Sequence, residues 1–77
     1  MMGKHKRPHR KYLSSDFIYK IKSSFLYAGS QVPQKYKITY GCLQGWFNGI
    51  NRAPIDHPEL HRIAKDLKFP VEKMFEQ

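Results

Sequence analysis

The strongest constraint on the fold is an apolar stripe in the last third of the chain. Its four members recur at positions i, i+3, i+4 and i+7: Leu60, Ile63, Ala64 and Leu67. That spacing places all four side chains on one face of a helix, which must be buried against the rest of the chain. Asp56 and Glu59 have the spacing of a capping box, and Pro58 suits a first turn. This segment therefore predicts an amphipathic helix that starts just after Asp56.

Helical periodicity also occurs closer to the N-terminal end. Ser14, Ser15 and Asp16 are residues of the type that caps a helix. Five apolar residues follow them at helical spacing: Phe17, Ile18, Ile21, Phe25 and Leu26. Gly29 comes after the last of these, so we expect it to stop the helix.

A third helical signal covers residues 39–48. Thr39 is expected to cap this helix, and Asn48-Gly49 is expected to end it. One side of the segment carries a nonpolar stripe: Cys42, Leu43, Trp46 and Phe47. We expect this stripe to pack in the core with Ile63 and Leu67, which leaves the opposite side of the helix free.

Shorter elements complete the expected fold. Ser30 would cap a short helix with Pro33 in its first turn. Residues 50–55 have the composition of a loop, and residues 71–75 suggest one closing turn or short helix. Taken together, these signals predict an all-α fold, a compact bundle of about five short helices.

The length of 77 residues allows one domain with a small core. We expect residues 14–77 to form this domain. Residues 1–13 are basic, contain Pro8 and have no apolar period, so we expect a flexible N-terminal arm.

The charge is strongly asymmetric. The net charge is +8, and residues 1–54 hold ten Lys and Arg against the single acid Asp16. Clustered Lys and Arg favour a polyanionic partner such as nucleic acid. A solubilising tail is the plainer alternative. A membrane surface fits less well, because the basic segment lacks an apolar face.

Other features bear on the compartment. The single Cys42 excludes an internal disulfide and is typical of a reducing environment. No apolar run approaches the roughly 20 residues of a membrane span, and no signal-peptide pattern follows the basic start. We expect a cytoplasmic protein associated with the nucleoid.

From residue 36 to residue 75, several features follow one another in a set order. They are Ile38-Thr39, Leu43, Trp46-Phe47, Asn48-Gly49, the run Leu60 to Leu67 with Ile63-Ala64 inside it, and Pro70-Val71. In this order they resemble the DNA-binding domain of the lambda-repressor-like (Xre/Cro type) helix-turn-helix family. The basic residues ahead of the first helix are similar to the arm of that family. Pro33 and Lys37 depart from the pattern, because the family usually has a small residue and a glycine there.

The resemblance implies a sequence-specific transcriptional regulator, a phage or bacterial repressor or a Cro-like protein. Such a protein binds double-stranded DNA, and we expect a homodimer on a two-fold operator. Contacts between the two copies would come from residues 69–75. Neither a small-molecule substrate nor a cofactor is evident.

The resemblance and the helix geometry together suggest three sets of DNA-contacting residues. The set expected to contact base edges lies on the free side of residues 39–48: Thr39, Tyr40, Gly41 and Gln44. The set expected on the DNA backbone surrounds that helix: Lys35, Lys37, Asn48, Asn51 and Arg52. The arm supplies the third set: Lys4, Lys6, Arg7, Arg10 and Lys11. For Gln44 and the glycines, a surface or spacing role remains the plainer alternative.

Other classes of function have weaker support. No acid pair beside a histidine and no phosphate-binding loop suggests catalysis, so we expect a protein that is not an enzyme. His57 and His61 have the spacing of a two-histidine metal site, but structural zinc needs four ligands and Cys42 is expected in the core. An RNA-binding protein, or a protein-interaction module of the antitoxin or anti-repressor type, remains an alternative on the same scaffold.

Overall fold

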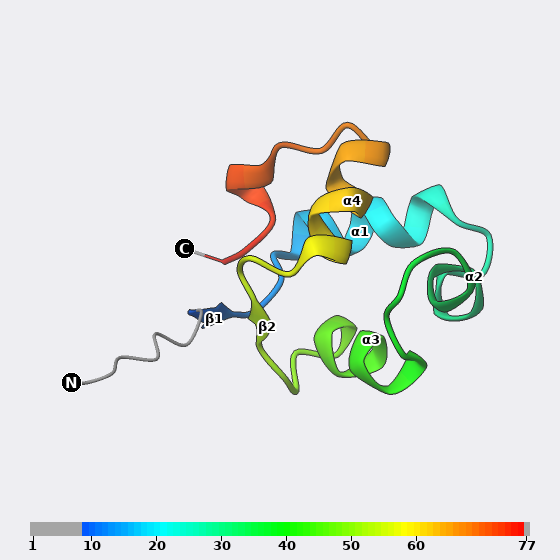
Figure 1. Ribbon diagram of the computed structural model, residues 1–77, viewed down its shortest axis with the longest axis horizontal. Coiled ribbons are helices and arrows are strands. Elements are labelled where there is room, and N and C mark those ends of the chain that lie inside the picture. The colour runs from blue at the N-terminus through cyan, green and yellow to red at the C-terminus, as the bar shows by residue number, and fades with distance from the viewer. Residues whose placement is uncertain (1–8, 77) are drawn as a thin grey trace.

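A computed structural model describes residues 9–76 of the chain. Within this range the protein is mostly helical, with a short two-stranded sheet (Figure 1). The α-helices are α1 (Ser15–Ser24), α2 (Ala28–Lys35), α3 (Tyr40–Phe47) and α4 (Pro58–Asp66). A 3-10 helix, η1 (Val71–Lys73), closes the chain, and the strands are β1 (Arg10–Lys11) and β2 (Ala53–Pro54).

The core is one cluster to which every α-helix contributes. Its members without any exposed surface include Phe17, Ile21, Val32, Leu43, Leu60, Ile63 and Met74. The aromatic ring of Phe69 packs at a tilt against that of Phe17, with ring centroids 5.0 Å apart. Within residues 9–76 no charged or polar side chain is buried. The apolar spacing read from the sequence therefore marks the core face of α4 and, through Phe17 and Ile21, that of α1. Leu26, expected on the same face, lies beyond the end of α1 and is 81% exposed.

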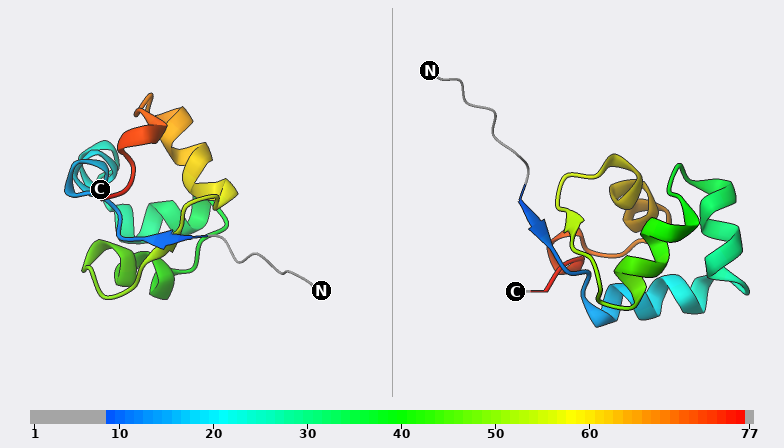
Figure 2. Two further views of the ribbon diagram at one scale, coloured as in Figure 1. Left: turned by 90° about the vertical axis from the view of Figure 1, so that its left-hand side faces the viewer. Right: turned by 90° about the horizontal axis from the view of Figure 1, so that it is seen from below.

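The N-terminal strand is part of the fold. β1 pairs antiparallel with β2, with Arg10 opposite Pro54 (Figure 2). Leu13 then forms a bridge with Phe75 and is only 2% exposed. The expectation of a flexible arm over residues 1–13 is therefore wrong for residues 9–13, which are held by pairing and burial. The arm residues Lys4, Lys6 and Arg7 lie outside the described residues.

The helix count and two helix boundaries also differ from the expectation. The described residues form four α-helices and η1, so the bundle of about five helices is not seen. α1 ends earlier than predicted because its C-cap, Phe25, is extended. Gly29 lies inside α2, which starts at Ala28 without a side-chain cap. Pro33 accordingly stands in the later half of α2, where it cannot donate to the carbonyl of Gly29.

The two remaining helix starts show one correct and one wrong prediction. Thr39 caps α3 as predicted, because its hydroxyl accepts the N–H of Cys42 at 3.2 Å. The predicted cap Asp56 does not serve α4; Nδ1 of His57 accepts the N–H of Glu59 instead, at 3.2 Å. The capping box fails because the carboxylate of Glu59 is used elsewhere, by Arg62 and by the backbone of another segment.

The segment after α4 turns its aromatic residues inward. Phe69 packs against Phe17, and Phe75 packs against the core beside Leu13. Val71 is the exposed apolar residue there. Phe69 and Phe75, the aromatic residues of the segment expected to contact a second copy, are thus partly buried against the core. None of the helices in the described part of the chain has the length and apolarity that crossing a bilayer requires.

Candidate nucleic-acid interface

The orientation of α3 is fixed by residues buried beneath it. Leu43 is fully buried and Trp46 is 5% exposed, so these two side chains attach α3 to the core. The other side of the helix faces outward: Tyr40 is 62% exposed, and Gly41 is exposed as well. Gln44 is half-buried on the same side. The predicted base-contacting residues are thus brought together on one surface.

α2 borders this outward surface on one side. A Cβ atom on Gly29 would lie 3.1 Å from Nε2 of Gln44 and 3.6 Å from Cε1 of Tyr40. The missing side chain of Gly29 therefore lets the side chains of α3 rest against α2. Sequence reasoning assigned this glycine to a helix stop, whereas its structural role is close helix packing.

The connection between α2 and α3 is tied to α4. The hydroxyl of Tyr36 donates to Oδ2 of Asp66 at 2.6 Å, and the N–H of Lys37 donates to the Glu59 carboxylate at 3.2 Å. The guanidinium of Arg62 lies 5.5 Å from the Tyr36 ring centroid and pairs with Glu59. Burial, followed by the hydrogen bond to Asp66, raises the pKa of Tyr36 to about 12. These contacts hold α3 at a set position relative to α4.

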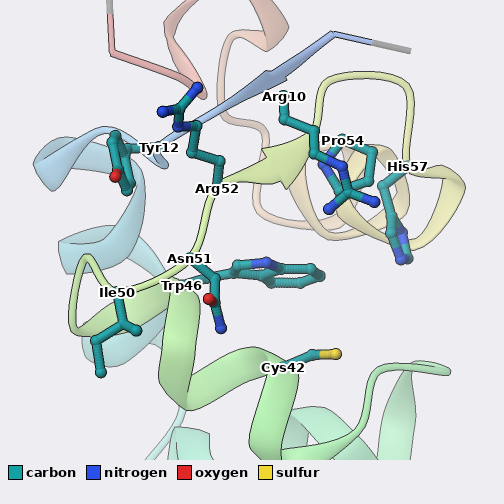
Figure 3. A pocket seen from close by; sticks show the side chains of 9 residues that line it. All are labelled: Arg10, Tyr12, Cys42, Trp46, Ile50, Asn51, Arg52, Pro54 and His57. Atoms are coloured by element: carbon teal, nitrogen blue, oxygen red, sulfur yellow. The ribbon is translucent and has the colours of Figure 1, made fainter. Parts of the chain in front are cut away.

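On its other side, α3 borders a groove of about 640 Å³. We call it the α3–β groove, because α3 and the β1–β2 pair form its walls (Figure 3). Its lining residues are Arg10, Tyr12, Cys42, Trp46, Ile50, Asn51, Arg52, Pro54 and His57. Three predicted DNA-contacting residues, Arg10, Asn51 and Arg52, thus meet at one place although they come from distant parts of the sequence.

The charge of the groove is positive. Arg10 extends from β1 into the groove, whereas Arg52 turns toward Tyr12 at the edge (Figure 3). The guanidinium carbon of Arg52 lies 5.5 Å from the Tyr12 ring centroid. In residues 9–76 the one salt bridge joins Arg62 to Glu59, so neither Arg10 nor Arg52 is paired with a carboxylate.

Asn51 is placed by the backbone at the end of α3. The N–H groups of Ile50 and Asn51 both donate to the carbonyl of Gly45, at 2.9 and 3.1 Å. The Asn51 side chain covers Gly45 so closely that a Cβ atom there would collide with it. Gly41, in contrast, has nothing within 4 Å of a Cβ position. The two glycines of α3 therefore serve different purposes.

The other predicted backbone-contacting residues do not line the groove. Nζ of Lys35 lies 5.8 Å from the ring centroid of Tyr36, on the side tied to α4. The backbone of Lys37 contacts Glu59. Asn48 is exposed at the C-terminal end of α3, and Lys11 is exposed in β1. Lys35, Lys37 and Asn48 thus lie apart from Arg10, whereas the arm residue Lys11 borders a smaller hollow with Arg10 and Arg52.

Sequence reasoning missed five residues of the groove: Tyr12, Cys42, Ile50, Pro54 and His57. Cys42 was expected in the core, but it is exposed, because the groove lies open above it. His57 lines the groove with its ring edge-on to Trp46, centroids 5.5 Å apart. Tyr12 supports Arg52. The spacing of Cys42 one turn before Trp46 was a signal for a shared face, but only the tertiary structure shows where that face is uncovered.

The described residues contain no group of three or more His, Cys, Asp or Glu side chains that could hold a metal ion. Comparison of the chain with protein-family models, with curated proteins and with solved structures gives no match.

Proposed function

We propose that this protein is a sequence-specific, double-stranded DNA-binding transcriptional regulator. In this proposal, α2, residues 36–39 and α3 form a helix-turn-helix of the lambda-repressor-like kind. α3 lies in the major groove, with Thr39, Tyr40, Gly41 and Gln44 toward the base edges.

The observation that carries the proposal is the two-sided character of α3. Leu43 and Trp46 are buried, while Tyr40 and Gly41 on the opposite side are exposed. A recognition helix needs this arrangement, because it must be rigidly held and still reach base pairs. The thin, open surface over Gly41 also permits close approach of a duplex.

Charge supports the same partner. Arg10 and Arg52 stand beside α3 without carboxylate partners. In the sequence, Lys4, Lys6 and Arg7 precede Arg10 and add three positive charges to the chain end that leads into β1. Cations that neutralise phosphates release counterions, so binding is expected to weaken steeply with salt.

The proposal is tested by selecting duplexes from a random pool and comparing binding of the chain and of Gln44→Ala. A bidentate contact from a glutamine to adenine contributes about 1–3 kcal/mol. Gln44→Ala should therefore bind the selected duplex at least about fivefold more weakly, with unchanged binding to unrelated duplexes. Lys65→Gln, on the exposed surface of α4, is the control. Equal losses on both kinds of duplex, or a preference for single strands, would reject the proposed reading by α3.

A homodimer belongs to the same proposal, since two-fold operators need two recognition helices about one helical turn apart. Within residues 69–75, expected to supply the contact, Phe69 and Phe75 are partly buried against the core and Val71 is the more exposed apolar residue. Sedimentation of the complex with the selected duplex measures the number of chains bound. One chain per duplex would contradict the dimer but not the DNA binding.

A further inference from the structure

We propose that Arg10 and His57 together form a binding site for one phosphate of the DNA backbone, in the α3–β groove. This inference rests on the proposed function and makes it more specific. It assigns a role to His57 and changes that of Arg10 from an arm residue to a fixed part of the interface.

Pairing of the strands fixes Arg10 in place. Arg10 stands opposite Pro54 in the β1–β2 pair, and the carbonyl of Pro54 accepts the N–H of His57 at 3.3 Å. The N–H of Ile55 donates to the carbonyl of His9 at 2.9 Å and extends the pairing beyond the strands. Arg10 and His57 therefore reach the same groove from two segments that are bonded to each other (Figure 3).

The capping bond of α4 determines what His57 can offer. Nδ1 of His57 accepts the N–H of Glu59, so the hydrogen of the neutral ring lies on Nε2. That N–H remains as a donor on a ring that lines the groove. A guanidinium and an imidazole N–H make a site for an anion, and no carboxylate lines the groove to compete for them.

The position of the groove indicates which anion it receives. The major groove is about 12 Å wide and admits one helix, so the two phosphate backbones lie along the two sides of that helix. α2 borders α3 on the side of Tyr40 and Gln44, and the α3–β groove borders it on the side of Cys42. Gly41 lies between Tyr40 and Cys42 around the helix. When Gly41 is innermost in the major groove, one backbone therefore runs along the Cys42 side, over Arg10 and His57.

The test uses duplexes recovered from the random pool, each with one phosphate replaced by an uncharged methylphosphonate. The full chain should lose about tenfold in affinity at one position in each half-site, as expected for loss of one charge-assisted contact. Arg10→Gln should bind the unmodified duplex about tenfold more weakly than the full chain does. Replacing the contacted phosphate should not weaken the binding of this variant any further. His57→Asn, which can still cap α4, should bind the unmodified duplex a few-fold more weakly and bind the modified duplex as the full chain does, because only the Arg10 contact remains to be lost at that position.

Lys65→Gln removes an equal charge from α4 and does not line the groove, so it should keep the full loss at that position. Thermal denaturation confirms that each variant is folded. At the methylphosphonate that replaces the contacted phosphate, both variants should bind as the full chain does. The inference is overturned if Arg10→Gln and His57→Asn bind more weakly than the full chain at every methylphosphonate. It is also overturned if the two variants match the full chain at two different positions. Absence of any duplex binding would overturn the proposed function itself.

Discussion

At the scale of single residues, the two glycines of α3 have opposite surroundings. A Cβ on Gly41 would meet nothing within 4 Å, while a Cβ on Gly45 would collide with the Asn51 side chain. Glycine lowers helix stability relative to alanine in both places. Packing among the described residues therefore does not require glycine at position 41, whereas the proposed close approach of DNA would.

Gly41→Ala should raise the free energy of unfolding by up to about 1 kcal/mol, because it restores helix propensity without a clash. The same variant should bind the selected duplex more weakly. Gly45→Ala is the matched variant and should be less stable than Gly41→Ala, because Asn51 must move aside. Chemical denaturation and duplex titration measure both effects. Unchanged duplex affinity in Gly41→Ala would argue against contact at that surface.

At the scale of elements, the contact between the α2–α3 connection and α4 gives a pH dependence. The pKa of Tyr36 is about 12 in the folded protein, against 10.0 for an ordinary tyrosine. Above about pH 10 the unfolded chain loses the tyrosine proton first, so it binds fewer protons than the native state. Stability should therefore fall as the pH rises from about 10 toward 12.

Tyr36→Phe lacks the titrating hydroxyl, so its stability should fall less over the same pH range. Urea denaturation of both proteins at several pH values compares the two slopes. Identical slopes would show that the pKa of Tyr36 does not differ between the folded and the unfolded chain.

The elements also show what local sequence can predict. The bounds of α3 follow from Thr39 and Asn48, and the core face of α4 follows from its apolar spacing, because these signals act within one helix. The pairing of Arg10 with Pro54 joins two-residue strands far apart in sequence, which carry no alternating pattern. It depends on packing of the whole chain, so no local signal marks it. The exposure of Cys42 has the same cause.

At the scale of the whole molecule, the N-terminal segment links the two ends of the domain. β1 pairs with β2, and the next residues bond to the chain after η1: the N–H of Ser14 donates to the Met74 carbonyl at 2.8 Å. Leu13→Ala should therefore lower the free energy of unfolding by about 2–5 kcal/mol, as for a buried leucine. Tyr19→Ala, at an exposed site on α1, is the control. Equal stability of the two variants would place Leu13 outside the core.

The most direct test of DNA binding by α3 is the reactivity of Cys42 toward a maleimide. Cys42 is the single cysteine of the chain, and it is exposed on α3 beside the groove. Bound duplex should slow its alkylation at least about tenfold, in proportion to the fraction of protein bound. The control, Cys42→Ser combined with Lys65→Cys, should react at the same rate with and without duplex. If Cys42 reacts equally fast in the saturated complex, α3 does not lie against the DNA.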